Sequence, residues 1–295
     1  HDPELIPIGL ALKLCGKKVV YDAHENLPRQ IMVKNWIPQV LRRPIALGVG
    51  FVERAASRVW DGVIAAYPSI ARNLGTSRVV LIRNYAMSNE FGSSSERPYH
   101  ERANIVAFVG GINEERGIFE MMEAVSLLPA SLNAKLVLAG TFSRPEIELR
   151  ARSLPGWKHV CNLGWQSRTN LSSILADSRI GIVTYHPIHH HIEAEPNKLF
   201  EYMAAGLPVV ASNLPNWKEI VEEASCGMTV DPLNADQIAR CIEWLLKNSE
   251  EAARMGQRGR AAILSTYNWE SQLDCLISLY RNIFASNGRS SLSSM

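Results

Sequence analysis

Between residues 104 and 230, short apolar runs rich in β-branched residues alternate with longer amphipathic stretches. The apolar runs are NIVAFVG, AKLVLAG, KHVCNLG, RIGIVTY, LPVVAS and CGMTV, and between them lie GIFEMMEAVSLL, PEIELRARS, SRTNLSSILADS, NKLFEYMAA and NWKEIVEEA. Repeated alternation of strand and helix indicates parallel strands, because each connection returns over the sheet through a helix. The pattern predicts an α/β fold with a doubly wound parallel sheet and helices on both faces.

The first hundred residues carry the same pattern in a smaller amount. Strands are predicted in KKVVYDAHE, at the start of DGVIAAYPSIARNLG, and in RVVLIRNY. Three strands are few for a parallel sheet, and the chain begins with His1 and runs directly into HDPELIPIGLALKL, which resembles the middle of a domain. We therefore expect a second Rossmann-like domain that is incomplete, in a chain that lacks its natural N-terminus.

A length of 295 residues, 46% of them apolar, is enough for two domains with separate cores. The polar, Ser-rich stretch MSNEFGSSSERPYHERA over 87–103 is predicted to link them. The expected organisation is a partial N-terminal domain over 1–100 that includes this linker, a C-terminal domain over 101–270, a last helix over 271–286 that packs back toward the N-terminal domain, and a disordered tail over 287–295.

Composition excludes several classes of protein. The net charge of +2 is too small for a nucleic-acid partner, which usually selects a concentrated basic face. Five widely spaced cysteines without a C-x-x-C pair indicate neither a zinc site nor a disulfide framework, and they fit a reducing cytoplasm. The longest apolar run, 45–52, is too short to span a membrane.

Two turns at predicted carboxyl ends of strands contain candidate ligand-binding residues. In FVGGINEERGIFEMM, Gly110 and Gly111 follow a strand, and Arg116 precedes a helix. The spacing matches neither dinucleotide-binding nor P-loop motifs. It indicates an anion site in which glycines allow close approach of backbone to a phosphate and Arg116 neutralises it. A tight turn with a solvated arginine explains the same residues.

The second turn joins the strand RIGIVTY to the helix NKLFEYMAA through a long loop over 185–196. Asn197 is predicted to cap this helix, and Gly206 to end it. The N–H groups near Lys198 and Leu199 would then offer a second diphosphate-binding helix terminus. Glu193 on the loop could meet sugar hydroxyls, and Glu201 on the helix could accept both ribose hydroxyls. Alternatively, the two glutamates only complement the helix dipole.

The segment E193-AEPNKLF-E201 followed by YMAAGLPVVAS resembles the E-x7-E region of glycosyltransferase family 4, the retaining enzymes of GT-B fold. FVGGINEERGI resembles the phosphate-binding loop of one branch, which makes bacterial surface polysaccharides such as O-antigen and capsule, and YNWE at 267–270 resembles the segment before its last helix. HDPELIP, VVYDAHE and VVLIRNY resemble the second half of the family's N-terminal domain, so the resemblance covers nearly the whole chain.

The resemblance implies that Glu193 faces the donor sugar and Glu201 the nucleotide ribose. Arg116 stands where the family usually has a diphosphate-binding lysine, and Gly111 stands where many members have an arginine. Phosphate binding would then rest on Arg116, Lys198 and helix dipoles. His24 matches a family histidine near the reacting sugar, with Asp22 and Glu25 shaping its loop; a core histidine at a strand end is the alternative.

The implied activity is retaining transfer of a sugar from a UDP- or GDP-sugar to a glycan or lipid-linked glycan, in the cytoplasm or at the inner face of the membrane. No D-x-D motif occurs, so neither a metal nor another cofactor is expected, and positive groups would stabilise the leaving diphosphate. Closure of the two domains would use the linker and the last helix as hinges. Two alternatives stay open: a nucleotide-sugar 2-epimerase of the same fold, and a non-catalytic module that binds sugar nucleotides.

Two other features have simpler explanations. His189, His190 and His191 are consecutive in the predicted loop, where neighbouring side chains seldom converge on one metal, although one of them could contact the donor. The stretch KNWIPQVLRRPIALGVGFVERAASRVW over 34–60 mixes arginines with apolar residues. We interpret it as packed helices of the N-terminal domain, and a membrane-surface helix is the alternative.

Overall fold

The computed structural model describes residues 3–24, 26–34, 36–89, 91 and 98–285. These residues form two compact units, and each is described by itself. Unit 1 comprises the described residues up to Asn84 and from Trp269 onward, and unit 2 runs from Tyr85 to Asn268. Glu25, part of the predicted linker and the predicted tail over 287–295 lie outside the described residues.

Unit 2 is built on a parallel sheet of six strands. In chain order they are β4 (Ile105–Val109), β5 (Lys135–Ala139), β6 (Val160–Asn162), β7 (Ile180–Val183), β8 (Val209–Ser212) and β9 (Gly227–Val230). Their order across the sheet is β6-β5-β4-β7-β8-β9. The chain therefore builds outward from β4 in one direction, returns to place β7 beside β4, and builds outward in the other direction. The predicted doubly wound sheet is confirmed, strand for strand.

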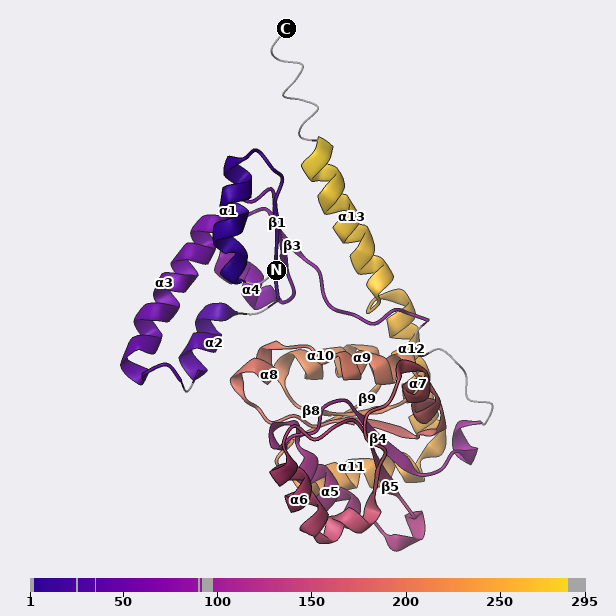
Figure 1. The fold of residues 1–295 in the computed structure, drawn as a ribbon. Helices are drawn as coiled ribbons and strands as arrows, with labels where there is room; N and C mark the ends of the chain where they lie inside the picture. Colours follow the sequence, from indigo (N-terminus) through magenta and orange to yellow (C-terminus); the bar gives the residue numbers. More distant parts are fainter. Residues whose placement is uncertain (1–2, 25, 35, 90, 92–97, 286–295) are drawn as a thin grey trace. The chain divides into compact units, whose positions relative to one another are not determined.

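Helices cover both faces of this sheet (Figure 1). They are α5 (Ile118–Ser126), α6 (Pro145–Ser153), α7 (Arg168–Asp177), α8 (His189–Glu193), α9 (Asn197–Ala204), α10 (Pro215–Ala224), α11 (Ala235–Lys247) and α12 (Ser249–Ser265). Figure 1 shows α8, α9 and α10 along one face and α5, α6 and α11 along the other. A sheet buried on both faces needs strands that are apolar at every position, and β7 and β8 are fully buried throughout.

The first residues of unit 2 pack into its core, although the sequence places them in the N-terminal domain or its linker. The Tyr85 ring lies 4.7 Å from that of Phe200 and 5.7 Å from that of Tyr267. The Tyr99 hydroxyl donates to the Arg179 carbonyl at 2.6 Å. The boundaries between the units therefore fall at 84/85 and 268/269. The physical reason is that the aromatic side chains of this polar stretch bury apolar surface against unit 2, which a solvated linker would not do.

Unit 1 has a parallel sheet of three strands, in the order β1 (Val20–Ala23), β2 (Gly62–Ala65) and β3 (Val79–Leu81). Its helices are α1 (Ile6–Leu14), α2 (Leu27–Val33), α3 (Gln39–Ser57), α4 (Pro68–Leu74) and α13 (Trp269–Ala285). Successive side chains of a strand point to opposite faces. Accordingly, Val63 and Ala65 pack with α1, α3 and α4, whereas Ile64 packs with Leu279 and Ile283 of α13.

Candidate functional site

The exits of β4 and β7 meet at the point where the order of strands in unit 2 reverses. Ligands of open parallel sheets bind at such a reversal, outside the carboxyl ends of the strands, because the two loops diverge there. The His186 N–H, after β7, donates to the Glu115 carbonyl, after β4, at 2.8 Å. This hydrogen bond joins the two segments that the sequence singled out separately.

Gly117 makes the close approach of these segments possible. Its φ is +75°, and a Cβ built on it would lie 2.2 Å from the Thr184 carbonyl oxygen. Any other residue would be strained and would push α5 away from β7. Because Arg116 directly precedes Gly117, in the 3-10 turn Glu114–Arg116, the glycine also fixes where this arginine lies.

The predicted anion-binding side chains gather at this end of the sheet. Arg116 Nη1 donates to the Gly111 carbonyl at 2.7 Å. The Lys198 side chain lies on Gly110, where a Cβ would be 2.6 Å from its Nζ. The φ of Gly110 is +100°, and the missing Cβ leaves the space that the lysine occupies. The structure thus brings Gly110, Gly111, Arg116 and Lys198 together.

This cluster combines the positive charges of Arg116 and Lys198. Burial lowers the pKa of Lys198, and the charges of Arg116 and Arg168 lower it further, while Glu201 opposes the shift. A cation whose charged form is disfavoured gains from an arriving anion, because the anion restores the lost solvation. The cluster is therefore suited to a ligand with several negative charges.

Glu201 is buried on α9, with 7% of its surface exposed, and Arg168 Nη1 donates to its Oε1 at 2.7 Å. Arg168 is the first residue of α7, after the loop that leaves β6, and its guanidinium lies 5.3 Å above the Phe91 ring. The sequence reasoning missed Arg168. The criterion that selected Arg116, a cation between a strand exit and a helix, also selects it.

One expectation for the start of α9 is wrong. Asn197 does not cap the helix: Pro196 is the N-cap, no side chain caps it, and Asn197 is the exposed first helical residue. The extended backbone of Pro196, with ψ of 127°, places the turn into the helix one residue earlier than predicted. The Leu199 N–H donates to the Pro196 carbonyl at 3.0 Å. Gly206 follows the helix with φ of +69°, as expected of the residue that ends it.

Glu193 ends a short helix, α8, where the sequence predicted an uninterrupted loop. The Glu193 carbonyl accepts from Asn216 Nδ2 at 3.4 Å, and the next carbonyl, of Ala194, accepts from Trp217 Nε1 at 2.6 Å. These bonds to α10 fix the backbone around Glu193, since Trp217 is fully buried. They explain why a segment between two helices holds a defined conformation.

The histidine run forms part of α8. His191 is buried, its ring lies 4.8 Å from that of Tyr185, and its Nδ1 is 3.1 Å from the His186 carbonyl. Among the described residues, no group of three His, Cys, Asp or Glu side chains is placed to hold a metal ion.

Tyr185, two residues after the end of β7, is a second residue that the sequence reasoning missed. The Arg116 guanidinium lies 5.4 Å above its ring. Its hydroxyl is buried without a hydrogen-bond partner in the described part of the chain, and burial raises its pKa to about 12. The Tyr185 ring therefore packs against the Arg116 guanidinium in a cation–π arrangement.

His24 lies in unit 1, directly after β1. Its Nε2 is 2.9 Å from Asp22 Oδ2, and its side chain is 52% exposed. Such a pairing fixes the orientation of an imidazole. His24 is thus an accessible strand-end residue of its unit, not part of a buried core.

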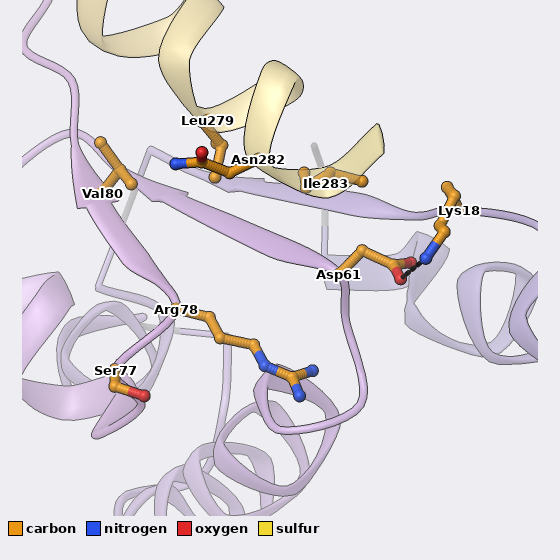
Figure 2. Close-up of a pocket in the computed structure, with 8 residues that line it drawn as sticks. All are labelled: Lys18, Asp61, Ser77, Arg78, Val80, Leu279, Asn282 and Ile283. Carbon is orange, nitrogen blue, oxygen red and sulfur yellow. Dashed lines mark hydrogen bonds and ion pairs between the residues drawn. The ribbon is translucent and has the colours of Figure 1, made fainter. Parts of the chain in front are cut away.

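Unit 1 also contains a cavity of about 500 Å³ between its sheet and α13. Figure 2 shows its lining, which comprises Lys18, Asp61, Ser77, Arg78, Val80, Leu279, Asn282 and Ile283. Lys18, Asp61 and Arg78 precede the three strands, so the cavity lies at their amino ends. This is the opposite end from the one at which parallel sheets bind ligands, and Asp61 there already pairs with Lys13 and Lys18.

Solved structures of similar fold include HepE from Anabaena with bound UDP. It matches at a TM-score of 0.69 with 17% identity, over 100% of this chain and 77% of HepE. The chain is also 22% identical to an MMP alpha-(1->4)-mannosyltransferase of Mycolicibacterium hassiacum, over 97% of this chain and 70% of that protein. The lipopolysaccharide core biosynthesis glycosyltransferase LpsE of Rhizobium meliloti is 24% identical, over 78% of this chain and 61% of LpsE.

The two units with parallel sheets and the structural neighbours define a protein of GT-B fold. The family model described as glycosyl transferases group 1 matches residues 93–262, which is more than half of the chain. The chain therefore belongs to the group 1 glycosyl transferases, and it is an enzyme of the hexosyl-transferring type. Membership in a family of enzymes argues against the non-catalytic module that the sequence analysis left open.

Proposed function

We propose that this protein is a retaining glycosyltransferase of family 4 that moves a sugar from a UDP- or GDP-sugar to a growing glycan in cell-surface polysaccharide synthesis. The observation that carries the proposal is the cluster of Arg116 and Lys198 on the glycine turn after β4. A nucleoside diphosphate has the charge and the size that such a cluster at a sheet reversal accepts. The UDP bound to HepE supports a nucleotide donor.

The proposed roles follow from the chemistry of each side chain. Arg116 and Lys198 would stabilise the leaving diphosphate, which is the charge that develops in the transition state. Glu201, held by Arg168, would accept from the ribose hydroxyls through its second oxygen. Glu193 would face the donor sugar. His24 would act near the reacting sugar from unit 1.

No metal is required in this scheme, because fixed cations supply the positive charge that a bound ion would otherwise provide. The acceptor would be a glycan or a lipid-linked glycan. The protein would then act in the cytoplasm, at the inner face of the membrane that carries such an acceptor. Within the described residues, no helix has the length and apolar character to cross a membrane.

Calorimetric titration with UDP, GDP and ADP tests the proposal, with Glu201→Ala and Arg116→Ala as variants. We expect one diphosphate to bind, and both variants to lose it while melting at the temperature of the unaltered protein. Asp236→Ala, exposed in the first turn of α11, is the matched acidic control. Absence of binding by a folded protein at millimolar concentration would contradict the proposed donor site.

Incubation with the sugar form of the diphosphate that binds then separates the two enzymatic alternatives. A transferase needs an acceptor and leaves the donor sugar unchanged in its absence, apart from slow hydrolysis. A nucleotide-sugar 2-epimerase converts the donor without a second substrate. Turnover to an epimeric sugar in the absence of acceptor would favour the epimerase.

A further inference from the structure

Helix α3 in unit 1 buries one face and leaves an apolar face exposed. Ala46, Glu53 and Ala56 are buried against the neighbouring elements of the unit. Six large apolar residues of the same helix are exposed, and they are Val40, Leu41, Ile45, Leu47, Phe51 and Val52. Exposed apolar residues that occur singly are ordinary, whereas a contiguous group on one helix marks a surface that contacts something apolar.

The exposed face also carries positive charge and no negative charge. Val40, Leu47 and Phe51 are spaced as i, i+7 and i+11, and Arg43, Arg54 and the C-cap residue Arg58 fall on the same side. We call these three apolar residues and three arginines the α3 outer face. Among the described residues, none of its three arginines has a carboxylate partner; Arg54 and Arg58 donate to backbone carbonyls. Glu53, the sole acidic residue of 27–60, is buried and accepts from Tyr21.

Trp36 lies three residues before the start of α3 and is a further exposed apolar residue of this segment. It is 77% exposed, and Lys34 Nζ lies 5.6 Å above its ring. Tryptophan and lysine side by side are typical of the boundary between lipid headgroups and acyl chains, because the indole is apolar with one polar edge and the ammonium meets phosphate. The packed-helix interpretation of 34–60 thus accounts for the buried face of α3 and leaves this one unexplained.

We propose that the α3 outer face binds the surface of a membrane that contains anionic lipids. Leu47 and Phe51 would enter the headgroup boundary, and Arg43, Arg54 and Arg58 would contact lipid phosphates. An amphipathic helix with cations on its polar side lies in the interface and does not span it. Charge also disfavours a second copy as the partner, since two-fold pairing of this face would bring arginines against arginines.

Sedimentation with lipid vesicles tests the proposal on the whole chain, without nucleotide or acceptor. We expect binding to phosphatidylcholine vesicles that contain about one-third phosphatidylglycerol, and at least tenfold weaker binding to phosphatidylcholine alone. Replacing Arg43, Arg54 and Arg58 by Gln should weaken binding about a hundredfold, because each cation near an anionic surface contributes about fivefold. Raising the salt concentration should also weaken vesicle binding by the unaltered protein.

Leu47→Glu with Phe51→Glu should abolish binding. Leu149→Glu is the matched control, since Leu149 and Leu47 are both 68% exposed on helices and Leu149 lies in unit 2. If the double Glu variant does not fold, Leu47→Ala with Phe51→Ala should fold and bind at least tenfold more weakly. Absence of binding to the anionic vesicles, or binding that these variants leave intact, would overturn the proposal.

Gel filtration of the same variants distinguishes a self-association surface. A dimer that the double Glu variant converts to monomer, without vesicle binding by either, would assign this face to a second copy and contradict the lipid proposal. The inference extends the proposed location and does not depend on the donor site. Vesicle binding without nucleotide binding, or the reverse, tells which of the two proposals has failed.

Discussion

Arg168 Nη1 donates to Glu201 Oε1 at 2.7 Å, and the pair joins the first residue of α7 to the buried side of α9. The two residues stand 33 positions apart and belong to different crossovers of the same sheet. Glu201 is thereby held through Oε1, and we propose that its second oxygen meets the ligand. The pair positions the carboxylate that we assign to the nucleotide ribose.

Arg168→Ala is expected to weaken nucleotide binding more than it weakens the fold. The Arg168 side chain is 58% exposed, so solvent screens the pair and its contribution to stability is about 1 kcal/mol or less. The nucleotide dissociation constant should rise about fivefold, because Glu201 loses its fixed orientation. Arg168→Lys should restore part of the loss. Calorimetry and thermal melting together test this, and an unchanged dissociation constant in Arg168→Ala would show that Arg168 does not position Glu201.

Lys198 gives an expected dependence on pH. Its pKa is lowered below the usual 10.5, by burial first and then by Arg116. Between the lowered pKa and 10.5 the unfolded state binds more protons than the folded state, so the free energy of unfolding rises with pH across that window. Lys198→Met removes the partly buried cation. It should raise the melting temperature at neutral pH and remove this rise, while weakening nucleotide binding.

Nucleotide affinity should respond in the opposite direction. As Lys198 loses its proton, the site loses one cation, so binding of a diphosphate should weaken toward alkaline pH. Lys198→Arg keeps the charge at every accessible pH and should flatten this decline. Lys218→Met, at an exposed position on α10, is the control and should change neither curve. If nucleotide affinity declines equally toward alkaline pH in Lys198→Arg, the decline is caused by a group other than Lys198.

Gly117→Ala should destabilise unit 2 by about 3 kcal/mol or more, since a strained left-handed φ combines with a collision against the Thr184 backbone. Gly206→Ala separates the two causes. Gly206 has φ of +69°, close to the +75° of Gly117, but among the described residues no atom beyond its own chain neighbours lies within 4 Å of its Cβ position. The substitution Gly206→Ala should therefore lower the free energy of unfolding by only about 1 kcal/mol. Chemical denaturation measures both, and equal costs would mean that the contact with Thr184 relaxes freely.

Asp61 should make unit 1 sensitive to acid. Burial alone would raise its pKa, but bonds from Lys13, the Val19 N–H and Lys18 outweigh burial and hold the pKa at about 2. Its contribution of about 2 kcal/mol is present above the unfolded pKa near 3.8 and is lost as pH falls through about 2. Asp61→Asn should lose that amount at neutral pH and show a flatter acid limb. Asp274→Asn, exposed on α13, should leave the acid limb unchanged.

Much of the fold could be predicted from residue pattern. The runs NIVAFVG and RIGIVTY became β4 and β7, because a strand covered on both faces must be apolar at every position, and this leaves a local mark. The ends of elements were less certain. Pro196 moved the start of α9, and a short helix formed at Glu193 because Trp217, distant in sequence, binds the backbone beside it.

The candidate site divides in the same way. The sequence by itself determined the doubly wound sheet, the glycine turn at Gly110 and the two stretches that could bind phosphate, since each depends on neighbours along the chain. Only the tertiary structure decided that β7 lies beside β4, that Lys198 rests on Gly110, and that Arg168 holds Glu201. Strand order is set by the packing of whole crossovers. Contacts between residues so far apart therefore leave no periodic signal for the sequence to reveal.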